Sequence, residues 1–191
     1  MRIVAGAYKG HSISAPKGPD TRPTSDRVRE AVFSSLGSMG VELDGAAILD
    51  LFCGSGALGL EALSRGARSA TFVDTARSAA AAAASNVERL GLKGAARVLR
   101  QDAFKLVRGP LPGAPFALLF LDPPYRIDPA RVRQLLEDAA ASDLLSEEAV
   151  VVYELSAHGE PAWPEGFAPI GSKTYGGTRV AYGVWRKEHV S

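Results

Sequence analysis

The segment Phe116-Ala117-Leu118-Leu119-Phe120-Leu121 is a continuous apolar run that ends in Asp122-Pro123-Pro124-Tyr125. A run of this length closed by turn residues is typical of a strand buried on both faces, as in parallel sheets covered by helices. The tetrapeptide follows the carboxyl end of that strand, the edge where open α/β sheets bind their ligands. Its two prolines remove two backbone donors, which leaves carboxylate and carbonyl acceptors beside an aromatic ring. This combination suits a planar base with an exocyclic amino group, and a rigid turn capped by aspartate is the alternative.

Apolar segments alternate with helical patterns over most of the chain, which predicts an α/β fold. The expected strands are 46–52, 69–73, 95–99, 116–121 and 149–155, and the expected helices end near residues 65, 90 and 141. Two further strands, 168–173 and 178–185, flank a Tyr-Gly-Gly turn and predict an antiparallel hairpin at the end of the sheet. Ahead of the sheet, residues 2–5 and 11–14 predict a small β-hairpin, and a helix begins at 24–26. We therefore expect an N-terminal extension, residues 1–40, on a main domain, residues 41–191.

The charge of the chain is concentrated near its N-terminus. The 191 residues carry a net charge of only +1, but residues 1–30 hold six Lys or Arg against three Asp or Glu, a local balance of +3. A local positive charge can contact phosphate groups, although a solvated basic surface is an equally good interpretation. The basic residues of this segment are Arg2, Lys9, Lys17, Arg22, Arg27 and Arg29.

Cysteine and histidine usage argues against a disulfide or a bound metal. Cys53 is the single cysteine, and the three histidines are scattered without the spacing of metal ligands. The N-terminus has no apolar signal sequence, and no apolar stretch approaches the ~18 residues of a membrane span. We therefore expect a cytoplasmic protein that binds no metal and does not enter a membrane.

A glycine-rich loop between a strand and a helix marks a cofactor site. Gly54-x-Gly56-x-x-Gly59 matches the dinucleotide fingerprint, and Asp74 follows about 20 residues later at the end of the next strand. Glycines let the backbone approach a ligand closely, and an acidic side chain at that place accepts hydrogen bonds from both ribose hydroxyls. Both NAD and S-adenosylmethionine have these requirements.

Asp50 favours S-adenosylmethionine over NAD. It lies just before the glycine loop, where its carboxylate would repel the pyrophosphate of NAD but attract the ammonium and sulfonium groups of S-adenosylmethionine. A loop-capping role is the alternative for Asp50. Asp102, which ends the third strand, can accept a hydrogen bond from the adenine amino group, or it can cap a helix.

These motifs, in this order, resemble those of class I S-adenosylmethionine-dependent methyltransferases that modify exocyclic amino groups. The resemblance rests on Asp50-Leu-Phe-Cys-Gly-Ser-Gly-Ala-Leu-Gly59, then Asp74, Asp102 and Asp122-Pro-Pro-Tyr125. The block Arg22-Pro-Thr-Ser-Asp-Arg-Val-Arg-Glu-Ala-Val-Phe33 ahead of the glycine loop narrows it to the bacterial 16S ribosomal RNA guanine-N2 methyltransferases of the RsmD type. Matching segments at both ends extend the resemblance over nearly the whole chain.

The resemblance implies a Rossmann-like sheet of seven strands with the last strand antiparallel. It implies S-adenosylmethionine as methyl donor, bound by Asp50, Phe52, Gly54, Gly56, Asp74, Asp102 and Ala103. It also implies a catalytic face of Asp122, Pro123, Pro124 and Tyr125, acting on guanine N2 in 16S ribosomal RNA within an assembling 30S particle.

The expected partner and oligomeric state complete this hypothesis. We expect a monomer that contacts RNA phosphates through Arg2, Lys9, Arg22, Arg27 and Arg29, although Arg27 and Arg29 can instead pair with Asp26 or Glu30.

Four other functions share part of this pattern. DNA adenine-N6 or cytosine-N4 methyltransferases usually carry a separate recognition domain, for which 191 residues leave little room. Protein glutamine methyltransferases usually open the tetrapeptide with asparagine. An NAD-binding oxidoreductase fits the glycine loop but leaves residues 122–125 unexplained, and a non-catalytic RNA-binding module needs no cofactor loop.

Overall fold

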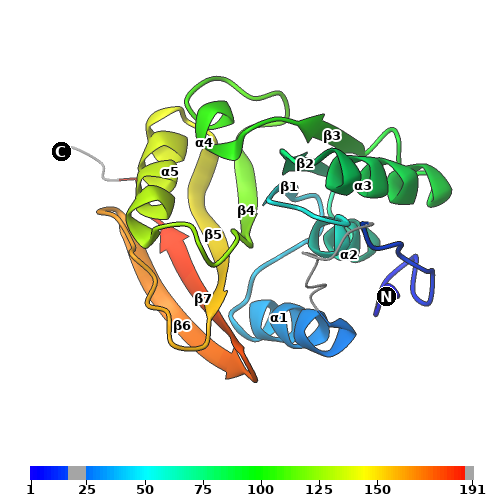
Figure 1. Cartoon of the computed structure of the whole chain (residues 1–191), viewed down its shortest axis with the longest axis horizontal. Helices are drawn as coiled ribbons and strands as arrows, with labels where there is room; N and C mark the ends of the chain where they lie inside the picture. Colours follow the sequence, from blue (N-terminus) through cyan, green and yellow to red (C-terminus); the bar gives the residue numbers. More distant parts are fainter. Residues whose placement is uncertain (17–24, 188–191) are drawn as a thin grey trace.

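The computed structural model describes residues 1–16 and 25–187 and contains a seven-stranded sheet with the order β3-β2-β1-β4-β5-β7-β6 (Figure 1). The pairs from β3 to β5 are parallel, and β7 is antiparallel to both of its neighbours, β5 and β6. This is the α/β fold predicted from the sequence, including the antiparallel end. The strands are β1 (Ala47–Leu51), β2 (Ser69–Asp74), β3 (Ala96–Arg100), β4 (Phe116–Leu121), β5 (Leu145–Ser156), β6 (Phe167–Tyr175) and β7 (Thr178–Trp185).

Helices cover both faces of the sheet, which is why its central strands are continuously apolar. The helices are α1 (Asp26–Ser38), α2 (Ala57–Ser64), α3 (Arg77–Arg89), α4 (Ala103–Leu106) and α5 (Pro129–Ala141). One core cluster lies under α1, α2 and α3, and the other lies under α4 and α5 (Figure 1). Successive residues of β4 alternate between the two, since Leu118 and Phe120 belong to the first and Leu119 and Leu121 to the second. No helix within the described residues is long and apolar enough to cross a membrane.

The N-terminal segment packs against α1 and α2 through two buried isoleucines. Ile3 and Ile13 are 1% and 3% exposed and belong to the same core cluster as Phe33 of α1. Antiparallel pairing in this segment is limited to one bridge, between Arg2 and Ser12, so the predicted hairpin is shorter than expected. The segment thus contributes side chains to the core and few backbone pairs.

Most strands agree with their predicted bounds within one or two residues, and two elements differ more. Strand β5 begins at Leu145 instead of 149. Its register against β4 shifts between Phe116 and Leu118, and Glu148 has a positive φ of 59°, so the strand continues through an irregular segment that contains its acidic residues. Helix α4 has only four residues and follows directly from Asp102, too short a segment to show a helical period.

Candidate active site

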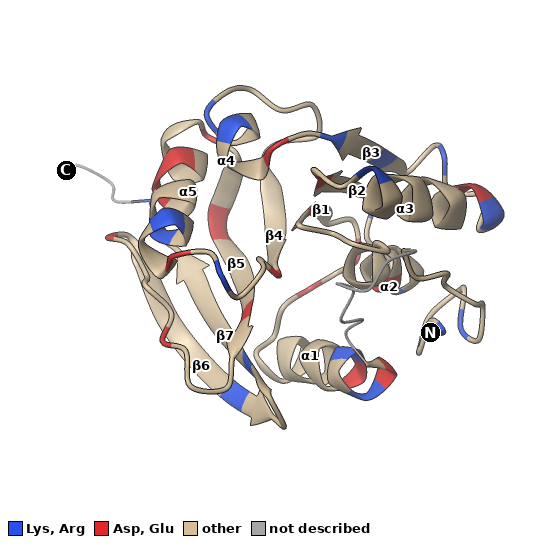
Figure 2. Ribbon diagram, in the orientation of Figure 1, with Lys and Arg blue, Asp and Glu red and all other residues tan. Residues whose placement is uncertain are grey.

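Three predicted site aspartates lie together at the carboxyl ends of β1, β2 and β4. The backbone register places Leu51 of β1 beside Val73 of β2 and Leu121 of β4. Asp74, the last residue of β2, therefore lies at the same level as Asp122, which follows β4, and Asp50 lies two residues earlier on the strand between them. The chain order reverses between β1 and β4, which is the place where open α/β sheets form a ligand crevice. Figure 2 shows acidic residues at this edge of the sheet.

The glycine loop turns sharply between β1 and α2. Phe52 has a φ of 60° although it is not glycine, and such conformations concentrate at functional sites. Gly56, with a φ of 79°, is the residue that caps α2. A Cβ atom on Gly59 would lie 2.4 Å from Cε1 of Phe72, so only glycine lets α2 approach β2 this closely.

Asp50 and Asp74 hold this loop through its backbone amides. Asp50 Oδ2 accepts a hydrogen bond from Gly59 N at 3.0 Å, so its loop-capping role is present in the structure. Asp74 Oδ2 accepts from Gly54 N at 3.0 Å, and its Oδ1 accepts from Ala76 N at 2.9 Å. Each carboxylate oxygen has a further lone pair, so these bonds leave capacity to accept from a ligand.

Burial makes Asp50 and Asp122 hard to ionise. The pKa of Asp50 is raised well above its ordinary value, chiefly because the side chain is desolvated, and further by the charges of Asp122 and Asp74. Desolvation also raises the pKa of Asp122, to about 7. Burial and the charge of Asp50 raise the pKa of the Cys53 thiol, so this cysteine is a packed and unreactive residue. A bound cation would relieve the repulsion among these carboxylates.

Asp102 caps α4, the alternative that the sequence left open. Its Oδ1 accepts from Phe104 N at 2.8 Å, and the neighbouring Ala103 is 3% exposed. The ring of Phe104 lies against that of Phe52 with centroids 5.7 Å apart, and the Arg131 guanidinium covers it at 4.4 Å. Phe104 was not among the residues predicted for this site, because a helix of four residues shows no periodic pattern.

The tetrapeptide Asp122–Tyr125 joins the sheet edge to the β6–β7 hairpin. Pro123 is buried, while the carbonyl of Pro124 accepts from Ile127 N at 2.9 Å and closes a turn. Tyr125 is 47% exposed, and its hydroxyl lies 3.2 Å from Oγ1 of Thr178 at the start of β7. The aromatic ring is thus held at the rim of the site by a strand far away in the sequence.

The basic residues predicted to contact RNA divide into two groups. Arg2, Lys9 and Arg27 are exposed, and no ion pair joins any of them to another residue of the ranges 1–16 and 25–187. Arg29 is buried, so the prediction that it contacts phosphate is wrong. Arg22 lies outside the described residues.

Arg29 is the centre of a buried polar network. Its Nε donates to Glu61 Oε2 at 3.3 Å, and its Nη2 donates to Asp26 Oδ1 at 3.0 Å and to the carbonyl of Arg2. Glu61 also accepts from Val4 N and Ala5 N, at 2.8 and 3.0 Å. The charge of Arg29 therefore joins the N-terminal segment, α1 and α2 inside the protein.

The described residues form no candidate metal site. Within 1–16 and 25–187, no group of three or more His, Cys, Asp or Glu side chains is arranged to hold a metal ion.

Comparison with known proteins identifies relatives over almost the whole chain. The family model described as Conserved hypothetical protein 95 matches residues 1–184. Ribosomal RNA small subunit methyltransferase D of Escherichia coli is 35% identical over 193 residues, which cover 98% of this chain and 90% of that protein. Among solved structures, the yhhF protein of Escherichia coli is 33% identical with a TM-score of 0.82, covering 98% of this chain and 99% of that one.

A more distant structure shares the fold. The RNA methyltransferase from Salinibacter ruber, solved with S-adenosyl-L-homocysteine, is 18% identical with a TM-score of 0.63 and covers 88% of this chain and 96% of that one. The full-length match to the family model and the 35% identity to a curated relative agree with the motif order along this sequence. The chain belongs to the family described as Conserved hypothetical protein 95, the RsmD family.

Proposed function

We propose that this protein transfers a methyl group from S-adenosylmethionine to the exocyclic N2 of one guanine in 16S ribosomal RNA, at position 966 as in RsmD-type enzymes. The observation that carries the proposal is the pair Asp50 and Asp122 at one sheet edge beside the glycine loop. Both carboxyl groups have raised pKa values, so the site favours a cationic ligand next to an acceptor for an amine.

The residues around the glycine loop fit the methyl donor. Asp50 provides the negative charge for its ammonium and sulfonium groups, and Asp74 provides acceptors for the ribose hydroxyls. Relatives with this fold have been solved with the donor or its demethylated product bound. When bound, the donor supplies an electrophilic methyl group on sulfur. The residues proposed to hold it are Asp50, Phe52, Gly54, Gly56, Asp74, Asp102 and Ala103.

The tetrapeptide supplies the acceptors for the amine. Guanine N2 is a poor nucleophile because its lone pair is delocalised into the ring. Asp122 and the carbonyl of Pro123 accept hydrogen bonds from its two N–H groups. This arrangement favours a pyramidal nitrogen with its lone pair directed at the methyl group. The carbonyl of Pro124 is already bonded to Ile127 N, so the Pro123 carbonyl is the better candidate. Most of the rate then comes from positioning and from preorganised acceptors.

Tyr125 stacks on the target base, because its ring is the exposed aromatic surface at the rim of the site. A base inside a duplex cannot reach the tetrapeptide, so the target guanine is unpaired or flipped out. Arg2, Lys9 and Arg27 contact phosphates of the surrounding RNA, with Arg22 as a further candidate in the same extension. The substrate is the 16S RNA of an assembling 30S particle, and the enzyme acts as a monomer.

One experiment tests the reaction directly. Labelled S-adenosylmethionine is incubated with the protein and with 16S RNA or 30S particles from a strain that lacks the gene, and the RNA is then digested to nucleosides. We expect label in N2-methylguanosine only. Label in N6-methyladenosine or N4-methylcytidine would replace the proposed target. Calorimetric titration with S-adenosylmethionine and with NAD separates the methyltransferase from an oxidoreductase, and binding of NAD alone would overturn the proposal.

A further inference from the structure

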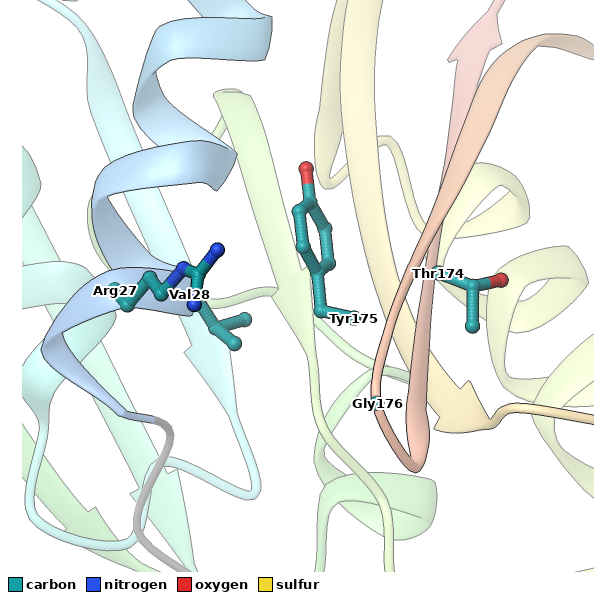
Figure 3. Close-up of a pocket in the computed structure, with 5 residues that line it drawn as sticks. All are labelled: Arg27, Val28, Thr174, Tyr175 and Gly176. Atoms are coloured by element: carbon teal, nitrogen blue, oxygen red, sulfur yellow. The ribbon is translucent and has the colours of Figure 1, made fainter.

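A groove separates the start of helix α1 from the tip of the β6–β7 hairpin. It has a volume of about 340 Å³ and is lined by Arg27, Val28, Thr174, Tyr175 and Gly176. Figure 3 shows the Tyr175 ring standing between the helix and the hairpin, with Arg27 and Val28 on the opposite wall. The Thr174 side chain points to the other side of the strand, so the strand contributes its backbone there. The groove thus has a cationic and apolar wall facing an aromatic one.

The hairpin tip connects this groove to the tetrapeptide. Tyr175 is paired with Thr178 across the turn, and Thr178 also pairs with Ser156 at the end of β5. The hydroxyl of Thr178 lies 3.2 Å from that of Tyr125. Both tyrosines therefore stand at the same edge of the sheet, Tyr125 before β7 and Tyr175 beyond it. A nucleotide chain bound at Tyr125 would therefore have the groove beside it.

The chemistry of the groove matches a single nucleotide. Tyr175 is half-buried and packs on the core, so its ring is held in place, whereas the Arg27 side chain is exposed. Every base offers a π-face for stacking, and a guanidinium binds phosphate in a bidentate way. The volume lies at the lower end of the ~300–1,000 Å³ range of small-ligand sites, which admits one nucleotide and excludes a helix.

We propose that this groove binds the nucleotide next to the target guanine, with its base stacked on Tyr175 and its phosphate paired with Arg27. The inference rests on the proposed function and extends it with a second RNA-binding site. Moving the target base into the catalytic site breaks its stacking with the neighbouring base. Tyr175 replaces that lost partner, so the groove holds the RNA in the extended conformation that the reaction requires.

Four variants test the groove in steady-state methyl transfer with the RNA substrate that the wild type uses. Tyr175→Leu removes the aromatic ring and keeps an apolar side chain, and Tyr175→Phe keeps the ring. Arg27→Ala removes the cation. Arg133→Ala is the matched control, because Arg133 is an exposed arginine on α5, across the sheet from the groove, and is paired with Glu137. Thermal unfolding and S-adenosylmethionine affinity are measured for each.

The expected results separate the ring from the charge. Tyr175→Leu raises KM for RNA about 5- to 150-fold, the equivalent of one base–aromatic stack, with kcat and S-adenosylmethionine affinity near wild type. Tyr175→Phe has the same KM for RNA as the wild type. Arg27→Ala weakens RNA binding and lowers the slope of log affinity against log salt by about one. Arg133→Ala changes none of these values.

Several outcomes would overturn the inference. One is a wild-type KM for RNA in Tyr175→Leu, and another is a raised KM in Tyr175→Phe. A third is an unchanged salt slope for Arg27→Ala. If Tyr175→Leu does not fold, Tyr175→Phe and the salt slope of Arg27→Ala decide. A defect on 30S particles with no change in salt slope would assign the groove to a protein partner and also overturn it. Wild-type protein that methylates no ribosomal RNA would overturn the proposed function and this inference together, whereas active wild type with normal variants overturns only the inference.

Discussion

The Nε atom of Arg29 lies 3.3 Å from Oε2 of Glu61, and neither side chain has any exposed surface. Two residues earlier on the same helix, Arg27 is exposed and lines the groove. One arginine therefore stabilises the fold, and the other is available to a ligand. Removing one partner of a buried ion pair leaves an uncompensated charge, which typically costs ~3–5 kcal/mol, whereas exposed substitutions usually stay within ~0.5 kcal/mol.

We therefore expect Arg29→Ala to lower the free energy of unfolding by about 3 kcal/mol, because Glu61 keeps Arg65 and two backbone donors. Arg27→Ala should change that free energy by less than ~0.5 kcal/mol. Urea unfolding monitored by tryptophan fluorescence measures both. Equal stabilities of the two variants would contradict the structural role of Arg29.

Asp122→Asn should abolish most methyl transfer, because the amide cannot accept the amine proton as a carboxylate does. Loss of one preorganised catalytic acceptor typically costs ~10²–10³-fold in kcat. Affinity for S-adenosylmethionine should fall far less than kcat, because Asp50 still provides a carboxylate for the donor. Asp143→Asn, at an exposed residue paired with Lys187, is the matched control. Retention of most single-turnover activity by Asp122→Asn would rule out its catalytic role.

The stability of the free protein should depend on pH through Asp122. Its pKa rises from 3.8 to about 7 on folding, so the folded state binds the proton more tightly than the unfolded state. The ionised form is disfavoured in the folded state, and stability therefore falls as pH rises from about 4 to about 7. The full shift corresponds to about 4 kcal/mol, and partial solvent access reduces the expected effect to roughly 1–3 kcal/mol.

Asp122→Asn removes this penalty. The variant should gain stability over wild type at pH 8 and gain little at pH 4.5, as measured by thermal unfolding at both pH values. A difference between variant and wild type that stays constant across this range would contradict the raised pKa of Asp122.

Binding of S-adenosylmethionine should release protons between pH 6 and 8. A sulfonium beside Asp50 and Asp122 favours their ionised forms and lowers the pKa values that burial raises. Calorimetry in two buffers with different ionisation enthalpies measures the protons released. S-adenosylhomocysteine, which lacks the sulfonium charge, is the control ligand and should release fewer. Equal proton release for the two ligands would argue against the placement of the sulfonium.

Gly59→Ala should destabilise the protein and weaken cofactor binding. The added methyl group would lie 2.4 Å from the Phe72 ring and 3.1 Å from Asp50 Oδ2, so α2 must move away from β2. Overpacking of this kind typically costs ~1–3 kcal/mol. Gly94→Ala is the matched control, because nothing lies within 4 Å of its added methyl group. Thermal unfolding and S-adenosylmethionine titration of both variants measure the difference.

The sequence predicted the parts of the fold that local patterns control. Continuous apolar strands, the Gly54–Gly59 loop and the glycine turn at 176–177 fixed the α/β class and the antiparallel end, because each signal lies within one short segment. The same segments placed Asp50, Asp74 and Asp122 at one edge, since the carboxyl ends of parallel strands meet there.

The features that the sequence did not predict depend on contacts between distant segments. Arg27 and Arg29 look alike on α1, and Glu61 of another helix decides which of them is buried. Tyr175 could be placed in a turn, but its position opposite Arg27 depends on how the hairpin meets α1. Phe104 belongs to a helix of four residues, too short for a periodic pattern.

The glycine turn after Tyr175 has a consequence for how RsmD-type proteins can diverge. Gly177 is exposed, and nothing lies within 4 Å of a Cβ atom built on it. Other side chains can therefore be placed at residue 177 without a clash with the residues around the turn. If the groove reads the neighbouring nucleotide, the choice of RNA and the grip on the methyl donor are encoded by separate pieces of chain, and the first can be redesigned while the second is left untouched.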